Sequence, residues 1–561
     1  MLPSDSRISF AFPAMKLIPF LIALSFVLVA CSKAPETAPP PAAKAAVQAQ
    51  AAATAASTSL AKAESATAEH GIAWQTGDVD AVFSAAKADH KPVFLYWGAK
   101  WCPPCNQVKA TIFNRQDFIE RSRHFVPVYV DGDTPSAQKL GSRFKVSGYP
   151  TMILFTPDGR EITRLPGEVD ADQYMRVLNM GMNGARPIKE ILTTALSAGD
   201  TTRARLKPED WRMLSFYSWD TDDQQLVAKN DVAATLQKLA KACPADQPES
   251  ATRLALKALM IAATAKDVKP RDDAAAAALI RKVVADPQVS RANFDILTNK
   301  AGDLASYVTL PRSPERAQLI AEWNGALSRL VGDSSLSTAD RLTVVIAQVD
   351  LARLDIGKAA LPETLQKSVR EQVARADRET TDLYERQAVI STAADALEEA
   401  GLMTESDALL TNELTRSHSP YYYMLGLAAN ARKRGDKAVA LGWYEQAYGA
   451  ADGPATRLQW GASYISALVE LAPQDTARIE TAVSHVIGEL DAKPDTFFGR
   501  NQKSLERMGK KLTAWNKGNQ HGDSLQRIRA QMAGVCGKMP STDPARAVCD
   551  GALRPARTTQ T

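Results

Sequence analysis

A continuous apolar run that leads into a Cys-x-x-Cys motif constrains this sequence more than any other feature. Residues 93–97 read Val-Phe-Leu-Tyr-Trp, and Cys102-Pro-Pro-Cys105 follows. Such a run predicts a strand that is buried on both faces. Residues 103–121 have a helical pattern, so both cysteines lie where the strand gives way to a helix. Two thiols at this spacing and place are typical of a dithiol that exchanges with other disulfides.

The segments around the motif alternate between helix and strand signals. Helices and strands are expected in the following order: helix 78–87, strand 93–97, helix 103–121, strand 125–130, helix 136–144, strands 151–155 and 161–165, and helix 170–179. This order predicts an α/β layer with a mixed sheet over residues 71–183.

Strand signals vanish after residue 187, where Ala and Leu dominate. Helix-start signals recur, such as Ser313 before Pro314 and the capping box from Ser337 to Asp340. We expect about fifteen helices over residues 187–535, arranged as a large all-α helical array or α-solenoid.

Part of this array resembles a tetratricopeptide repeat. Gly401 precedes Gly435 by 34 residues, and Ala394 precedes Ala428 in the same register. Small side chains at Ala428 and Ala440 predict two closely packed helices around a turn at Gly435. The aromatic residues nearby are expected to form core between helices rather than a ligand site: Tyr421, Tyr422, Tyr423, Trp443, Tyr444, Tyr448, Trp460 and Tyr464.

The N-terminal segment has the layout of a secretory signal. Its apolar stretch is too short to span a membrane and ends in Leu-Val-Ala-Cys31. That ending resembles a bacterial lipobox, which implies that residues 1–31 are a lipoprotein signal and that Cys31 carries lipid. Ser32 favours the outer over the inner membrane, so a lipid-anchored periplasmic protein is expected. Met15 is an alternative start, and a plain secreted protein is the alternative interpretation.

Residues 32–70 are nearly all Ala, Pro, Thr, Ser, Gln, Lys and Glu, which predicts a disordered tether. Charge is almost balanced along the chain, with 67 Lys and Arg against 63 Asp and Glu. This balance gives no reason to expect nucleic acid as a partner.

Export to an oxidising compartment lets disulfides persist. With Cys31 assigned to lipid and Cys102 and Cys105 to exchange, three of the six cysteines remain: Cys243, Cys536 and Cys549. We expect Cys536 to pair with Cys549 and to staple the C-terminal tail, residues 536–561. Pairing of Cys243 with either of them is the alternative, because spacing alone does not set connectivity.

The dithiol itself predicts a definite chemistry. Cys102, at the start of a helix, is expected to ionise and attack as the thiolate, and Cys105 to resolve the mixed disulfide. Two alternatives are a structural disulfide and half of a zinc site. Because no second Cys/His pair has suitable spacing, no metal is expected, and no cofactor beyond the Cys102–Cys105 disulfide.

Residues 71–183 resemble the thioredoxin superfamily, in particular its bacterial periplasmic members, including the C-terminal domain of the disulfide reductase DsbD. The motifs that carry the resemblance are Lys91-Pro-Val-Phe-Leu-Tyr, Trp101-Cys-Pro-Pro-Cys, Val130-Asp131 and Tyr149-Pro150-Thr151. The resemblance implies a thioredoxin-like fold, a cis peptide bond before Pro150, and a substrate groove flanked by Trp101 and Tyr149. It also implies two kinds of partner: protein substrates with thiols or disulfides, and a dithiol protein that donates or accepts electrons.

The sequence departs from this family at two positions. Tyr96 stands where many members have a buried carboxylate, and Pro127 stands where thioredoxin has a lysine. Fast reduction is therefore in doubt, and the direction of exchange stays open. The leading hypothesis is a thiol-disulfide oxidoreductase whose helical region recruits partners. The rival hypothesis is a protein-binding or chaperone-like scaffold in which the thioredoxin-like domain serves only adhesion.

Overall fold

The structure is a computed structural model that describes residues 71–553, except residues 147, 168, 185, 198, 266–267, 358 and 491. The predictions for the signal segment, for Cys31 and for the tether lie outside the described residues.

Four strands form one mixed sheet: β1 (Val93–Gly98), β2 (Val126–Asp131), β3 (Thr151–Phe155) and β4 (Glu161–Leu165). Their order is β2-β1-β3-β4, with β1 parallel to β2 and with β3 antiparallel to both β1 and β4. The predicted mixed sheet is confirmed. All six residues of β1 are buried, as its unbroken apolar run predicts, because both faces of the sheet are covered.

Five α-helices accompany the sheet: α2 (Val79–Ala88), α3 (Pro103–Val108), α4 (Gln116–Ser122), α5 (Pro135–Arg143) and α6 (Ala171–Met182). The side chains of Asp78, Thr134 and Asp170 accept hydrogen bonds from the first backbone N–H groups of α2, α5 and α6. These caps satisfy donors that have no partner inside the helix, and so fix where each helix begins.

The single helix expected over residues 103–121 is wrong. α3 continues into a π-helical turn, η1 (Lys109–Phe113), and α4 begins only after Arg115, whose backbone is extended. Phe113 and Phe118 both pack into the core across this break, with ring centroids 4.9 Å apart. Ile112 and Ile119, on either side of the break, are seven residues apart, a spacing that fits one helix face, so periodicity at these positions does not reveal the break.

The rest of the described chain is helical. Its first half comprises α7 (Ile188–Ala195), α8 (Asp200–Arg203), α9 (Pro208–Phe216), α10 (Val232–Ala242), α11 (Pro248–Ala263), α12 (Ala274–Ala285), α13 (Pro287–Ala292), α14 (Phe294–Asn299), α15 (Ala301–Val308), α16 (Pro314–Val331), α17 (Thr338–Arg353) and α18 (Glu363–Glu379).

The second half comprises α19 (Leu383–Glu399), α20 (Met403–Glu413), α21 (Pro420–Arg434), α22 (Lys437–Ala450), α23 (Pro454–Leu471), α24 (Thr476–Gly488), the 3₁₀ turn η3 (Pro494–Phe497), α25 (Gly499–Trp515), α26 (Gly522–Cys536) and α27 (Pro544–Gly551). The predicted helical array is confirmed, with more helices than the fifteen expected because short ones such as α13 and α14 are separate. No helix in these described segments is long and apolar enough to cross a membrane.

The predicted helix–turn–helix around Gly435 is present. Gly435 ends α21 in the left-handed conformation, with φ of 87°. Ala428 and Ala440 are fully buried on the two packed helices, α21 and α22. The assignment of this unit to the tetratricopeptide repeats stays a prediction.

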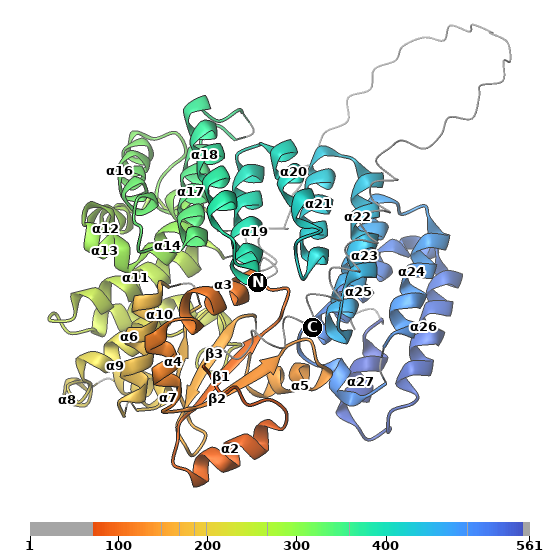
Figure 1. Ribbon diagram of the computed structural model, residues 1–561, viewed down its shortest axis with the longest axis horizontal. Helices are drawn as coiled ribbons and strands as arrows, with labels where there is room; N and C mark the ends of the chain where they lie inside the picture. The colour runs from red at the N-terminus through yellow and green to blue at the C-terminus, as the bar shows by residue number, and fades with distance from the viewer. Residues whose placement is uncertain are drawn as a thin grey trace, which may run out of the picture.

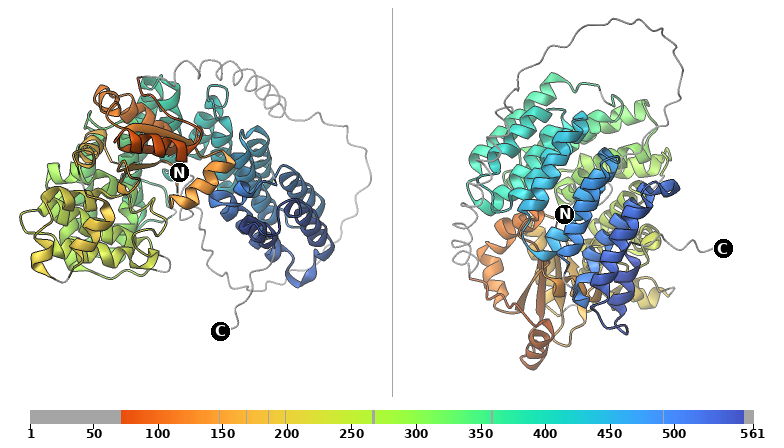
Figure 2. Two further views of the ribbon diagram at one scale, coloured as in Figure 1. Left: turned by 90° about the horizontal axis from the view of Figure 1, so that it is seen from below. Right: turned by 90° about the vertical axis from the view of Figure 1, so that its right-hand side faces the viewer.

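The helices form an arch around the sheet (Figure 1). α7 to α18 lie on one side, α19 to α21 lie above, and α22 to α27 lie on the other side; Figure 2 shows the same enclosure from two further directions. The arch contacts the thioredoxin-like layer at several places, where α7 packs on β4, α9 on α6, α19 on α3, and α25 with η3 on α5.

The hydrophobic core is continuous between the sheet and the arch. One face of β1, with Leu95 and Trp97, belongs to a cluster that extends to Tyr422, Trp460 and the helices beyond them. The other face, with Phe94 and Tyr96, belongs to a cluster that extends through α6 into α9, α10 and α11. Each face of the sheet is therefore joined to a different arm of the arch.

Candidate active site

Cys102 and Cys105 form a disulfide at the start of α3, with their Cα atoms 5.2 Å apart. Cys102 is the N-cap residue of this helix, and its Sγ accepts a hydrogen bond of 3.2 Å from the Cys105 backbone N–H. Pro103 and Pro104 lie between the cysteines and have no N–H to donate. The geometry therefore supplies Cys102 with a donor from Cys105, which favours the thiolate after reduction.

Tyr149 and Pro150 lie just before β3, and the peptide bond between them is cis, as the resemblance to the thioredoxin superfamily implied. The Tyr149 hydroxyl donates to the Gly132 carbonyl oxygen over 3.1 Å and accepts from Gln138 Nε2 over 3.1 Å. Its ring lies 6.2 Å from the ring of Trp101, centroid to centroid. Two residues predicted to flank the substrate groove are thus brought together.

Both sulfurs are buried: the exposed fraction is 0% for Cys102 and Cys105, 2% for Trp101 and 3% for Tyr149. A substrate disulfide cannot reach either sulfur in this conformation, because attack requires access along the S–S axis. Helices of the arch pack on α3 and on the Trp101 side chain beside these sulfurs.

Aromatic side chains of the arch contact Trp101. Its ring stacks on Tyr422 of α21 and meets Trp460 of α23 edge to face, with centroid distances of 6.1 and 4.8 Å. The Arg500 guanidinium of α25 lies over the rings of both Trp101 and Tyr149. Tyr422 and Trp460, expected to form core between helices, therefore also cover the motif.

Polar contacts reach the same loop from other helices. Gln387 Nε2 on α19 donates to the Trp101 carbonyl oxygen over 3.5 Å. His418 Nε2 lies 3.1 Å from the Lys100 carbonyl oxygen. The loop that carries the dithiol is thus bonded to segments almost 300 residues away or more.

Asp133 is a site residue that the sequence analysis missed. Its Oδ1 accepts hydrogen bonds of 2.5 Å from both the backbone N–H and the hydroxyl of Thr456, at the start of α23. The Thr456 hydroxyl also accepts from Trp101 Nε1 over 2.8 Å. Burial raises the pKa of Asp133 to about 6. Only its position after β2 was visible in the sequence, because its partner lies 323 residues away.

Tyr96 lies inside the sheet, 2% exposed, and its ring is 4.9 Å from that of Phe113. Its hydroxyl has no hydrogen-bond partner among the described residues, and burial raises its pKa far above the ordinary value for a phenol. Tyr96 therefore stays protonated, and it does not accept a proton as a carboxylate at this position would.

The other predicted disulfide is present. Cys536, the last residue of α26, is bonded to Cys549 of α27, with Cα atoms 5.7 Å apart. Cys243 is half-buried and is the free cysteine of the described chain. The alternative pairing of Cys243 is therefore wrong.

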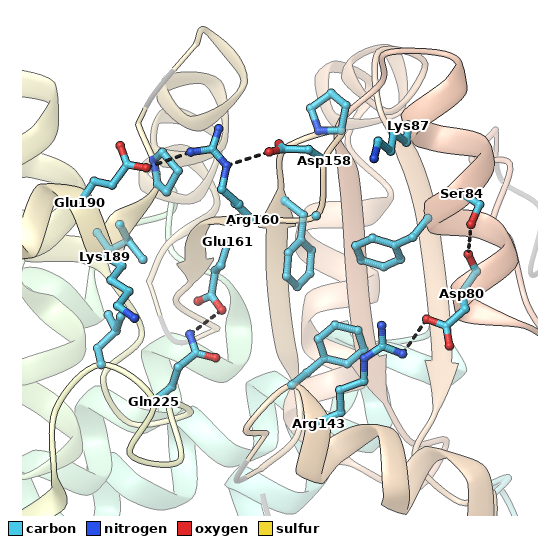
Figure 3. Close-up of a pocket in the computed structure, with 18 residues that line it drawn as sticks. Asp80, Ser84, Lys87, Arg143, Asp158, Arg160, Glu161, Lys189, Glu190 and Gln225 are labelled. Atoms are coloured by element: carbon cyan, nitrogen blue, oxygen red, sulfur yellow. Dashed lines mark hydrogen bonds and ion pairs between the residues drawn. The ribbon is translucent and has the colours of Figure 1, made fainter.

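A surface cavity of about 720 Å³ lies apart from these residues, between α2, the turn after β3 and the start of α7 (Figure 3). Phe83, Phe144 and Phe155 pack against one another there. Paired charges surround them, such as Arg143 with Asp80. Its lining includes neither cysteine, and its charges of both signs indicate no ligand class. No group of three or more His, Cys, Asp or Glu side chains within the described ranges is placed to hold a metal ion.

Comparison with known proteins places the similarity in the sheet-containing part of the chain. Residues 79–181 match the family model described as a thioredoxin-like domain. The thiol:disulfide interchange protein DsbD of Pseudomonas fluorescens is 30% identical over 103 residues, which is 18% of each chain. The disulfide bond reductase DsbH of Chlamydia pneumoniae is 27% identical over 95 residues, 14% of this chain and 55% of the relative.

Among solved structures, a thioredoxin from Thermus thermophilus is 26% identical and covers 19% of this chain, with 85% of its own chain matched and a TM-score of 0.18. The family model and the sheet show a thioredoxin-like domain, and Cys102 and Cys105 lie within it. The match takes in 18% of the length of the DsbD relative, so the relatives inform this domain alone.

Proposed function

We propose that this protein exchanges disulfides with other proteins through Cys102 and Cys105. The observation that carries the proposal is the Cys102–Cys105 disulfide at the start of α3, in a domain similar to a thiol:disulfide interchange protein and to a disulfide bond reductase. The helix start and the Cys105 N–H both favour the Cys102 thiolate, which is the reactive form.

Atoms and electrons balance in this exchange without a cofactor. In the reducing direction the Cys102 thiolate attacks one sulfur of a substrate disulfide, and the other substrate sulfur leaves as a thiolate. Cys105, deprotonated, then attacks Cys102 Sγ, which forms the Cys102–Cys105 disulfide and releases the second substrate thiolate. Two electrons pass from the protein to the substrate, and a dithiol partner protein returns them. The same steps in reverse oxidise a substrate.

The proposed setting is the periplasmic side of a bacterial membrane, with lipid on Cys31 and the helical arch recruiting partners. Substitution Cys31→Ser tests the anchor. We expect the variant to lose labelling by radioactive palmitate and to move from the membrane fraction to the soluble fraction. A protein that stays in the membrane without label would contradict the anchor and leave the exchange chemistry unaffected.

Substitution Cys105→Ser tests the exchange, because it stops the reaction at the mixed disulfide. Every variant also carries Cys243→Ser, so that Cys102 is the free thiol of the described chain. We expect purified Cys105→Ser protein to form a disulfide-linked adduct with a disulfide-containing substrate protein. The double variant Cys102→Ser/Cys105→Ser should form none, and equal adduct from both would refute the proposal.

The complete burial of both sulfurs favours a second function, a scaffold in which the arch binds partners and the dithiol takes no part. The two functions differ in the equilibrium with glutathione. An exchanger reaches a defined potential between about −270 mV for a reductant and about −120 mV for an oxidant. A Cys102–Cys105 disulfide with a potential below about −300 mV would favour the scaffold.

A further inference from the structure

The cover over the Trp101 side chain, next to the dithiol, is built from three helices of one arm of the arch. Tyr422 of α21, Thr456 and Trp460 of α23, and Arg500 of α25 all contact Trp101. We define these three helices as the cap. The other arm, α7 to α18, joins the domain through β4, through the opposite face of the sheet and through the contact of Asp340 with Gln107 on α3. Release of the cap would therefore leave the domain attached to the rest of the molecule.

The contact between cap and domain is concentrated at the start of α23. Asp133 accepts from the backbone N–H and the hydroxyl of Thr456, so a residue of the thioredoxin-like domain acts as a capping group for a helix of the cap. The Ala455 N–H also donates to the Asp133 carbonyl oxygen over 3.3 Å. The Trp101 Nε1–H group donates in turn to the Thr456 hydroxyl.

Glycine at position 453 is required by this contact. Its φ is 83°, and a Cβ atom there would lie 1.3 Å from Asp133 Oδ2. A methyl group at this place displaces the Asp133 carboxylate from the start of α23. Gly435 provides a matched position: its φ is 87°, and no described heavy atom lies within 4 Å of the place of its Cβ. The same substitution there also places alanine at positive φ without the clash, but in the left-handed region at ψ of 6° rather than at the ψ of 146° of Gly453.

A second contact lies at the start of α25. The Arg500 backbone N–H donates to Gln138 Oε1 over 2.9 Å, while Gln138 Nε2 holds the Tyr149 hydroxyl. The Arg500 side chain lies over the Tyr149 ring, 4.8 Å from its centroid. Trp101 and Tyr149, the two residues expected to flank the groove, are thus both covered by helices of the cap.

We propose that α21, α23 and α25 form a hinged cap that closes over the Cys102–Cys105 dithiol and opens before another protein reaches either sulfur. The contact of Asp133 with Gly453 and Thr456 sets how often the cap opens. Only the function of this opening rests on the proposed exchange. The opening itself is measured without a substrate.

The experiment measures how fast dithiothreitol reduces each disulfide in the oxidised full chain. Samples are quenched in acid and alkylated, and peptide mass spectrometry reports each cysteine separately. Cys536–Cys549 serves as an internal reference, because it is equally buried but lies outside the cap. In Gly453→Ala we expect Cys102–Cys105 to be reduced about 5- to 30-fold faster than in wild type, the effect of losing a helix cap. Gly435→Ala should match wild type.

A second pair of variants covers the case in which Gly453→Ala unfolds, which would accelerate reduction of both disulfides. Thr456→Val keeps the shape of the side chain and removes the hydroxyl that Trp101 and Asp133 share. Its control is Ser463→Ala on the same helix, whose hydroxyl bonds within α23 to Gln459. We expect faster reduction of Cys102–Cys105 alone in Thr456→Val.

Equal reduction rates in Thr456→Val, Ser463→Ala and wild type would overturn the cap. The two proposals fail in different ways. If the variants open the cap but Cys105→Ser still forms no adduct with a substrate, the cap stands and the exchange function falls. If adducts form while the rates of Cys102–Cys105 reduction are the same in all variants, the exchange function is supported and the cap proposal is refuted.

Discussion

At the scale of a single residue, Asp133 makes the opening of the cap depend on pH. Its pKa is raised from 3.8 to about 6, first because the carboxylate is buried, while the hydrogen bonds from Thr456 lower it. Asp131 on β2 and Asp452 before α23 face it with like charge and raise it further. When the cap opens, Asp133 returns to water and to its ordinary pKa. The closed state therefore binds a proton more tightly than the open state.

The sign of the pH effect follows from this difference. Stability that a raised pKa contributes is fully present below about pH 3.8 and is lost as the pH rises through about 6. We expect cap opening to increase between pH 5 and 7.5 in wild type and to change less in Asp133→Asn, which imitates the protonated carboxyl group. The ratio of their Cys102–Cys105 reduction rates, wild type over variant, cancels the pH dependence of dithiothreitol. It should rise about tenfold or more, since one pKa unit is a factor of ten.

A ratio that is constant or falls with pH would contradict this role for Asp133. Asp131→Asn is the control, because it removes a neighbouring charge but keeps the carboxylate that bonds Thr456.

The site residues close to one another in sequence were predictable, and the others were not. Cys102 and Cys105 are recognised by their spacing after an apolar run, and Cys536 and Cys549 by their proximity. The contact of Asp133 with Thr456 joins residues 323 positions apart and has no periodic signature. Burial of the dithiol was unpredictable for the same physical reason: it depends on how the arch closes, which no local pattern encodes.

At the scale of elements, the array is held by close helix approaches at small residues. At Gly461 on α23, a Cβ would lie 2.4 Å from Val486 Cγ2 on α24 and 3.1 Å from the Tyr448 ring on α22. Any side chain there must push one of three helices away, and packed cores resist such displacement.

Gly461→Ala is expected to lower the free energy of unfolding by about 1–3 kcal/mol, the usual cost of overpacking. Gly442→Ala is the matched control, since it lies in the interior of α22 and no described heavy atom is within 4 Å of its Cβ position. There alanine should stabilise by about 0.5–1 kcal/mol, because glycine loses more backbone entropy in a helix. Urea denaturation followed by circular dichroism measures both, and equal shifts would refute the close approach.

The Cys536–Cys549 disulfide joins two elements, α26 and α27, across a separation of 13 residues. Closing a loop of this size stabilises a fold by about 3 kcal/mol, mainly by restricting the unfolded chain. We expect Cys536→Ser/Cys549→Ser to lower the free energy of unfolding by about that amount and to increase hydrogen exchange in α27. Cys243→Ser should change it by less than about 1 kcal/mol. Unchanged exchange in α27 would show that packing alone holds this helix.

The helices and strands could be predicted where one apolar spacing persists along the sequence. The prediction was wrong where packing interrupts an element without changing that spacing. Strands β1 to β4 and most helices follow apolar spacing and cap residues such as Asp78 and Thr134. The break at Arg115 does not, because Ile112 and Ile119, seven residues apart, still have the spacing of one helix face. An ion pair of Arg115 with Asp172, 57 positions away, accompanies the break, and such a contact is invisible before folding.

At the scale of the whole molecule, the domain is enclosed rather than appended. Leu95 and Phe94, adjacent on β1, belong to two different cores, and each core continues into one arm of the arch. Gln107 on α3 adds a polar contact to Asp340 on α17, with a distance of 2.7 Å. The full chain is therefore the unit in which activity has to be measured, since cutting out the sheet would expose both core faces.

This enclosure predicts that cap opening limits turnover. Insulin reduced with dithiothreitol as electron donor reports the activity of the full chain. The exchange step at Cys102 occurs only in open molecules, so its rate is scaled by their fraction. We expect Gly453→Ala to reduce insulin about 5- to 30-fold faster than wild type, in step with its own disulfide, and Gly435→Ala to match wild type. Adding Cys102→Ser to Gly453→Ala should abolish activity. If Gly453→Ala exposes its disulfide but reduces insulin no faster, the arch does more than cover the dithiol, because its helices then contribute to binding the substrate.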